Sequence, residues 1–152
     1  MPQTTGAISW SDCKIQISND IFVAHDVDVS GFSNSVKVSG GERATAEFFT
    51  VYGDTPIVTK GKRSALEITV QVVYTEGVAE AYEVVRALYE SGGLLSIKWS
   101  PKGGSTGKFS YLTSPGYITK PPYPGGASDS ADALSFEISL KATLITKSVV
   151  TP

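Results

Sequence analysis

Apolar and polar residues alternate along most of this chain, which is the period of a β-strand with one buried face. The two longest alternating runs lie at residues 64–74 and 134–145. In each run we expect the apolar positions to face the core and the polar positions to face water or another chain. Shorter runs at 13–18 and 21–29 predict a hairpin, and residues 94–99 predict a further strand.

One segment, residues 77–91, has its apolar residues at helical spacing instead. Thr75 is a candidate for its N-cap, and Gly92 can end it in the left-handed conformation. One amphipathic helix among many strands is expected to cover an open face or end of a sheet. Its apolar stripe consists of Val78, Ala81, Tyr82, Val85, Leu88 and Tyr89.

These patterns predict a mainly β protein of about eight to ten strands with one flanking α-helix. A two-sheet β-sandwich or flattened barrel is the natural way to bury one face of each long strand. At 152 residues, the chain fits a single domain, 1–152, with a sound core. Within it we expect an N-terminal arm at 1–12 and a short polar C-terminal tail at 146–152.

Residues 40–63 do not fit a simple turn between strands. The segment is too long for a hairpin turn and too apolar for a disordered linker, and it combines β-prone residues with glycines, charges and Pro56. Proline lacks an amide donor and favours an edge strand or a loop. We therefore expect a long projecting inter-strand loop that meets another subunit.

The composition favours a protein that packs against its own copies. Charged residues make up 18% of the chain, below the quarter or so that is usual for a soluble domain. The net charge of −2 offers no basic footprint for tight nucleic-acid binding. The single Cys13 fits a reducing compartment, and neither a signal peptide nor an apolar run of about 20 residues is visible. We expect a soluble product made in the cytoplasm.

The residues that could carry chemistry form no convincing catalytic site. His25 and Asp26 are neighbours on one strand and so point to opposite faces, which disfavours a His25–Asp26 dyad. Cys13 with His25 could imitate a thiol catalyst, but a buried thiol and a packed or exposed imidazole are the favoured interpretation. Asp28 adds a carboxylate to this group, but a metal site would need a further protein ligand. The glycine-rich loop at 103–108 lacks the spacing of a phosphate-binding loop.

Paired carboxylates for glycoside hydrolysis would fall first on Glu67 and Glu137, although exposed strand carboxylates are usually only solvated. We expect no catalytic, cofactor-binding or metal site. Self-assembly is the first hypothesis that remains for its function. A monomeric carbohydrate-binding β-sandwich is the second, with Tyr111, Tyr117 and Tyr123 as a possible flat row of aromatic rings.

Several strings of residues resemble a known family. They are GGER at 40–43, YGDTPIVT at 52–59, GKR at 61–63, VYTE at 73–76, WSPKG at 99–103 and PYP at 122–124. Together they resemble the tail tube proteins of long-tailed, non-contractile bacteriophages over roughly residues 30–148. The fold of that family recurs in contractile tails and in type VI secretion tubes, which are the alternative assignments.

The resemblance implies a structural virion protein that forms hexameric rings stacked into a hollow tail tube for DNA. It implies further partners in a tail terminator, a distal tail protein and a tape-measure protein, and no role for a membrane. The segment 40–63 would stack onto the adjacent ring. Its expected inter-ring contacts are Glu42, Arg43, Phe48, Phe49, Tyr52, Asp54, Lys60, Lys62 and Arg63.

A conduit for DNA should be polar without holding phosphates, because a basic lining would bind DNA through counterion release. The polar faces of the two long strands meet this requirement. We therefore expect the residues that line the lumen to be Glu67, Thr69 and Gln71 or Glu137, Ser139 and Lys141.

Overall fold

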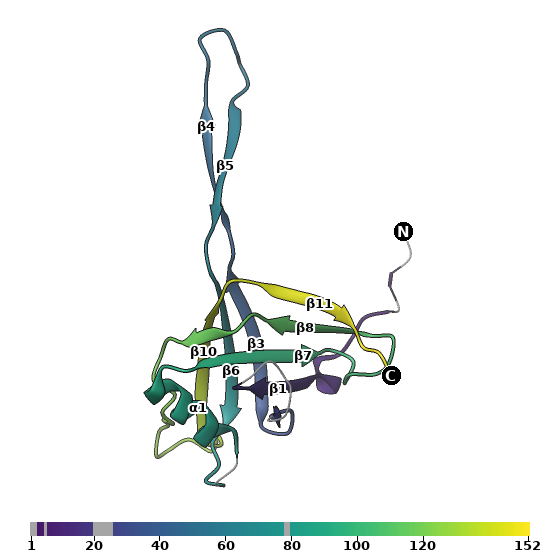
Figure 1. The fold of residues 1–152 in the computed structure, drawn as a ribbon, viewed down its shortest axis with the longest axis vertical. Coiled ribbons are helices and arrows are strands. Elements are labelled where there is room, and N and C mark those ends of the chain that lie inside the picture. The colour runs from purple at the N-terminus through teal and green to yellow at the C-terminus, as the bar shows by residue number, and fades with distance from the viewer. Residues whose placement is uncertain (1–2, 5, 20–25, 78–79) are drawn as a thin grey trace.

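The computed structural model describes residues 3–4, 6–19, 26–77 and 80–152. The chain folds into two β-sheets that share one strand, with one α-helix at their side and a long β-hairpin projecting from one end (Figure 1). The expected class, mainly β with two sheets and a flanking helix, is confirmed. His25 and the first part of the expected strand at 21–29 lie outside the described residues.

Both of the long alternating runs fall in the second sheet, as β6 and β10. Across the first sheet, the order is β2 (Asp26–Asp28), β1 (Lys14–Ser18), β7 (Leu94–Ser100), β8 (Phe109–Thr113) and β11 (Ile145–Val149). Across the second sheet, the order is β7, β9 (Gly116–Ile118), β10 (Ser135–Ala142), β6 (Leu66–Val73) and β3 (Ser33–Gly40).

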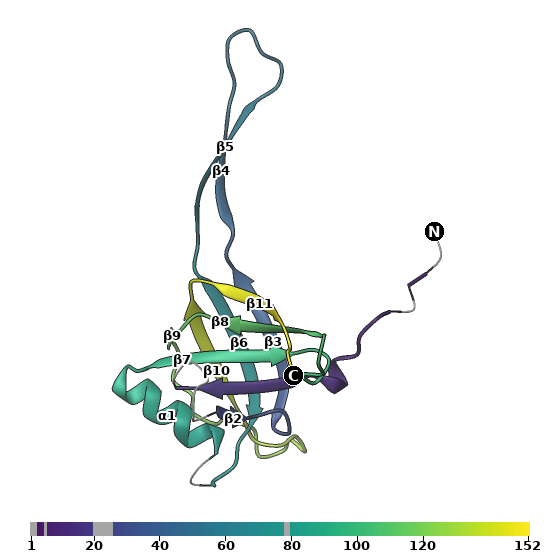
Figure 2. The same ribbon diagram turned by 45° about the vertical axis from the view of Figure 1, so that its right-hand side comes forward.

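Strand β7 joins the two sheets because its two halves have different partners. Leu94 and Leu95 pair with β9, while the remainder of β7 pairs with β1 and β8. The sheets thus lie face to face with their strands crossing, as the two views show (Figures 1 and 2). Gly116 permits this junction, since a Cβ there would lie 2.1 Å from the Lys141 carbonyl oxygen.

The core lies between the sheets and consists of the apolar faces that alternation predicts. Ile17 and Ile97 from the first sheet and Val70, Ile138 and Leu140 from the second are fully buried. The polar positions between them point away from the core. The alternation at 64–74 therefore identified the buried face of β6 correctly.

Helix α1 (Ala81–Ser91) packs against the ends of β7 and β9. Tyr82 anchors it, with ring centroids 4.8 Å from Tyr74 and 5.3 Å from Phe136 in edge-to-face contacts. Gly92 ends the helix in the left-handed conformation, with φ 71°, as expected.

The start of the helix was predicted wrongly, at residue 77. Ala81 is the first helical residue, and the N-cap is Glu80 rather than Thr75. The Glu80 carboxylate accepts hydrogen bonds from the Thr75 hydroxyl and the Gly77 amide, which ties Glu80 to the end of the segment after β6. In the described part of the chain, no helix is long and apolar enough to span a bilayer.

The C-terminal strands also differ from those expected from the sequence. The strand expected at 134–145 ends at Ala142, because the Ser114 hydroxyl accepts the amides of Thr143 and Leu144 and the chain bends there. Leu144 is consequently exposed rather than buried. Much of the expected polar tail at 146–152 belongs to strand β11, where Ser148 bonds Ser110 at 2.8 Å between the hydroxyl oxygens.

Candidate functional site

The outer face of the second sheet is a continuous polar surface formed by β3, β6 and β10. The strand register aligns the polar residues in three rows that cross the three strands. The rows are Ser35, Gln71 and Glu137, then Lys37, Thr69 and Ser139, then Ser39, Glu67 and Lys141. The two sets of residues expected to line a lumen thus lie directly opposite each other on neighbouring strands.

Opposite charges balance on this polar face. Lys37 and Lys141 accompany Glu67 and Glu137, and Lys120 Nζ lies 3.9 Å from the Glu137 carboxylate. Glu67 is half-buried, whereas Glu137 and the three lysines are exposed, so the Lys120–Glu137 ion pair contributes little to stability and is screened by salt. The three strands are therefore neutral, and Lys120 beside Glu137 adds one positive charge, so the face lacks the cluster of basic residues that would hold DNA.

Ser139 occupies the middle of the polar face but is buried. Its hydroxyl donates to Glu137 Oε1 at 3.0 Å, and its carbonyl oxygen accepts the Thr119 amide at 2.9 Å. Its neighbour Thr69 is half-buried, whereas Gln71, Glu137 and Lys141 are exposed. The charged residues and Gln71 therefore carry most of the accessible surface.

The segment 40–63 is a β-hairpin that extends far beyond the body of the protein (Figure 1). Its strands are β4 (Arg43–Phe48) and β5 (Ile57–Arg63), joined by residues 49–56. It continues β3 and β6 in line, and Gly40 makes the transition with φ 75°. A Cβ at Gly40 would lie 2.3 Å from the Ala65 carbonyl oxygen, so the base of the hairpin requires glycine.

The tip of this hairpin exposes apolar side chains that none of the described residues cover. Val51 is 95% exposed, Tyr52 is fully exposed and Phe48 is 67% exposed. Phe49 and Ile57 are exposed as well. An isolated two-stranded hairpin is marginally stable in water. A contiguous apolar surface of this kind marks an interaction site.

The stem of the hairpin places two arginines opposite each other. Arg43 lies directly opposite Arg63 in the register, and like charges in opposite positions are destabilising. Lys60 and Lys62 add positive charge on the same strand as Arg63. All the residues expected to contact the next ring lie on this exposed hairpin or at its base.

The structure brings together no catalytic group among the residues it describes. Burial raises the pKa of the Cys13 thiol, which keeps it protonated and weakly nucleophilic. The described residues contain no cluster of three or more histidine, cysteine or acidic side chains that could hold a metal. Tyr111 stacks on Trp99 with centroids 5.7 Å apart, so it cannot join Tyr117 and Tyr123 in an exposed row.

Two functional features were missed by sequence reasoning. Ser35, Lys37 and Ser39 of strand β3 were not assigned to the polar face. Their alternation with Val36 and Val38 was the signal. The second feature is a hollow at the end of the sheet opposite the hairpin, which joins residues 34, 71–73 and 125–135 and has no local sequence pattern.

Solved structures of tail and injection tubes share this fold. The SPP1 tail tube superposes with a TM-score of 0.70 at 17% identity, over 96% of this chain and 81% of that chain. A chain of the PVC sheath-tube complex, from an extracellular contractile injection system, gives 0.68 at 16% identity over 96% and 94%. The tail of a gene transfer agent particle gives 0.65 at 12% identity over 94% and 98%.

No protein-family model and no curated protein sequence matches the chain. The structural similarities show that it has the tail tube fold, which phage tails, gene transfer agents and contractile injection systems share. The family resemblance seen in the sequence is thereby confirmed at the level of the fold.

Proposed function

We propose that this chain is the tube subunit of a phage-like tail, in which hexameric rings stack into a hollow tube that conducts DNA. The observation that carries the proposal is the combination of one neutral polar sheet face with one uncovered hairpin on the same two strands. The polar face suits a bore, and the hairpin suits contact with a neighbouring ring. A monomer would use neither.

The edges of the second sheet support ring formation. Within the described chain, β3 pairs only with β6, so its other side presents free amide and carbonyl groups. Exposed edges of this kind favour pairing with another chain unless they are covered. In a closed ring, each edge meets the neighbouring subunit and no free edge remains.

The same arrangement of strands supports the position of the lumen. The side of β3, β6 and β10 that faces away from the core carries Glu67, Thr69, Gln71, Glu137, Ser139 and Lys141, and in a ring it would form the inner wall. Its balanced charges would let DNA pass without sequence-specific binding, since binding requires an excess of lysine and arginine. The subunit would be made in the host cytoplasm and reside in the virion tail.

Electron microscopy of the purified protein tests the proposal. We expect six-fold rings and tubes with an open bore, formed at high protein concentration. A protein that stays monomeric at every concentration, salt and temperature tried would refute the proposal. The tail terminator, distal tail and tape-measure proteins would join such a tube at its ends or inside it, and a tube terminating cap is among the similar structures.

The tube of a contractile injection system is the second candidate. The observation that favours it is the similarity to the PVC tube, whose TM-score of 0.68 lies close to that of the SPP1 tail tube. Particles purified from the producing cells discriminate between the two candidates. A contractile system shows a sheath around the tube, and a non-contractile tail shows a bare tube.

A further inference from the structure

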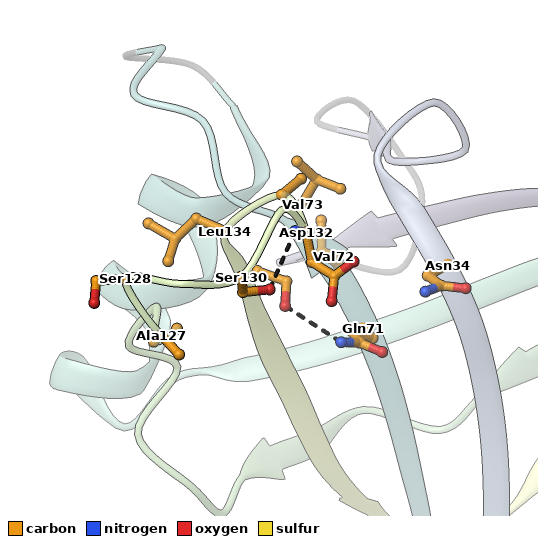
Figure 3. A pocket seen from close by; sticks show the side chains of 13 residues that line it. Asn34, Gln71, Val72, Val73, Ala127, Ser128, Ser130, Asp132 and Leu134 are labelled. Atoms are coloured by element: carbon orange, nitrogen blue, oxygen red, sulfur yellow. Dashed lines mark hydrogen bonds between the residues drawn. The ribbon is translucent and has the colours of Figure 1, made fainter.

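A hollow of about 720 Å³ lies at the end of the second sheet opposite the hairpin. Asn34 of β3 and Gln71, Val72 and Val73 of β6 form one wall, and the segment 125–135 forms the other (Figure 3). Gly125 and Ser135 form an isolated β-bridge that fixes the base of this segment. The hollow therefore belongs to the folded body.

The lining of the hollow suits an aromatic residue with a polar end. Val73 and Leu134 offer apolar surface, and Leu134 is 44% exposed. Gln71 donates from Nε2 to Ser135 Oγ at 3.2 Å, and the Asp132 amide donates to Ser130 Oγ at 3.1 Å. A tyrosine can bury its ring against the apolar wall while its hydroxyl reaches such polar groups.

We propose that this hollow receives the hairpin tip of a second copy of the chain, with Val51 and Tyr52 as the inserted residues. The inference rests on the proposed function and specifies the receptor for the stacking hairpin. The hairpin and the hollow lie at opposite ends of the β3–β6 strand pair. The hairpin continues this pair beyond Gly40, and the hollow lies at its other end, at Asn34. Translation along these strands brings the tip of one copy to the hollow of the next.

The length of the strands sets the spacing of such copies. The chain from Asn34 to Val51 covers 17 residue steps. At about 3.3 Å per step, this gives a reach of roughly 56 Å along the strands. Strands in closed barrels tilt by about 35–45°, which reduces the repeat along the tube axis to roughly 40–46 Å.

Site-specific crosslinking tests the contact in the full-length protein. In a Cys13→Ser background, Val51→Cys is combined with Ala133→Cys, which lines the hollow. Assembled tubes are treated with a short bis-maleimide and separated under denaturing conditions. We expect a ladder of covalent oligomers, because each subunit joins one copy above and one below. The matched control combines Val51→Cys with Leu144→Cys, an exposed position near the hairpin end of the body, and should give no ladder.

The outcomes separate this inference from the proposed function. Tubes that give no ladder with the hollow pair, or an equal ladder with the control pair, overturn the docking site and leave the tube function standing. A wild-type protein that forms neither rings nor tubes overturns both. Ala133→Arg provides a second test: it should leave rings intact and abolish their stacking, whereas Leu144→Arg should not. Tubes of normal length from Ala133→Arg contradict the docking site.

Discussion

The charge of the polar face offers a decisive test of the lumen. Replacing Glu67 and Glu137 by lysine changes the charge of each subunit by +4, which is about +24 in a ring of six. Double-stranded DNA carries one negative charge per about 1.7 Å, so a ring repeat of roughly 40–46 Å encloses about 24–27 phosphates. The substitutions therefore change the charge of the wall by about as much as the DNA inside it carries.

The double variant should still fold and assemble. Glu67→Lys places a like charge opposite Lys141, and Glu137→Lys removes the contact with Lys120. Cross-strand charge pairs contribute about 0.2–1 kcal/mol each, which a domain with this core tolerates. We therefore expect tubes of normal appearance by electron microscopy.

The expected defect is slow DNA passage that depends on salt. If the DNA contacts 6–10 of the added lysines in one ring, its affinity for the wall falls about 10³–10⁵-fold between 50 and 200 mM salt. Genome ejection from particles that carry the variant should thus stall at low salt and recover at higher salt. The assay is the fluorescence of a DNA-binding dye after ejection is triggered.

A pair of variants with equal charge change provides the control. Glu67→Gln with Glu137→Gln changes each subunit by +2 on the polar face, and Asp12→Lys changes it by +2 at an exposed site outside that face. The glutamine variant should slow ejection slightly and Asp12→Lys should not. Normal ejection kinetics from the double lysine variant at low salt would refute the assignment of this face to the lumen.

Three further predictions follow from the hairpin and the sheets. Deletion of Ala46–Lys60 should leave the circular dichroism spectrum and the thermal unfolding transition of the body nearly unchanged but stop ring stacking, and full-length tubes from this variant would refute the stacking role. Gly116→Ala should destabilise the fold by about 1–3 kcal/mol in chemical denaturation, because its Cβ would meet the Lys141 carbonyl oxygen, whereas Gly31→Ala, with open space around it, should not. The axial repeat of the tube, measured from electron micrographs, should fall at about 40–46 Å, and a repeat above the roughly 56 Å that the strands can span would exclude docking of the tip in the hollow.

The sequence determined the buried faces of the strands and the end of the helix. The alternation at 64–74 placed Ile68, Val70 and Val72 in the core, because side chains on a strand alternate with a period of two whatever the partner strand is. Gly92 ended the helix because only glycine adopts the left-handed conformation at no steric cost. The projecting character of residues 40–63 was also predicted, since the segment was too long for a hairpin turn and too apolar for a disordered linker.

The tertiary structure decided which strands are neighbours and in what register. That Glu67 lies opposite Lys141 depends on a contact between residues 74 positions apart, and no local pattern encodes it. Ser139 looked accessible from its alternation, but the Glu137 side chain and the adjoining Thr119 backbone cover it. The residues of the polar face were thus predictable one by one. Which charged residues lie opposite each other depended on the register of the strands.

The hollow and the two ends of the molecule also depend on the tertiary structure. The hollow joins Asn34, Gln71 and the segment 125–135, which meet only after three separate parts of the chain pair in one sheet. The sequence therefore indicated that residues 40–63 contact a partner, and the fold supplied the hollow at the opposite end, where we propose that a second copy binds them.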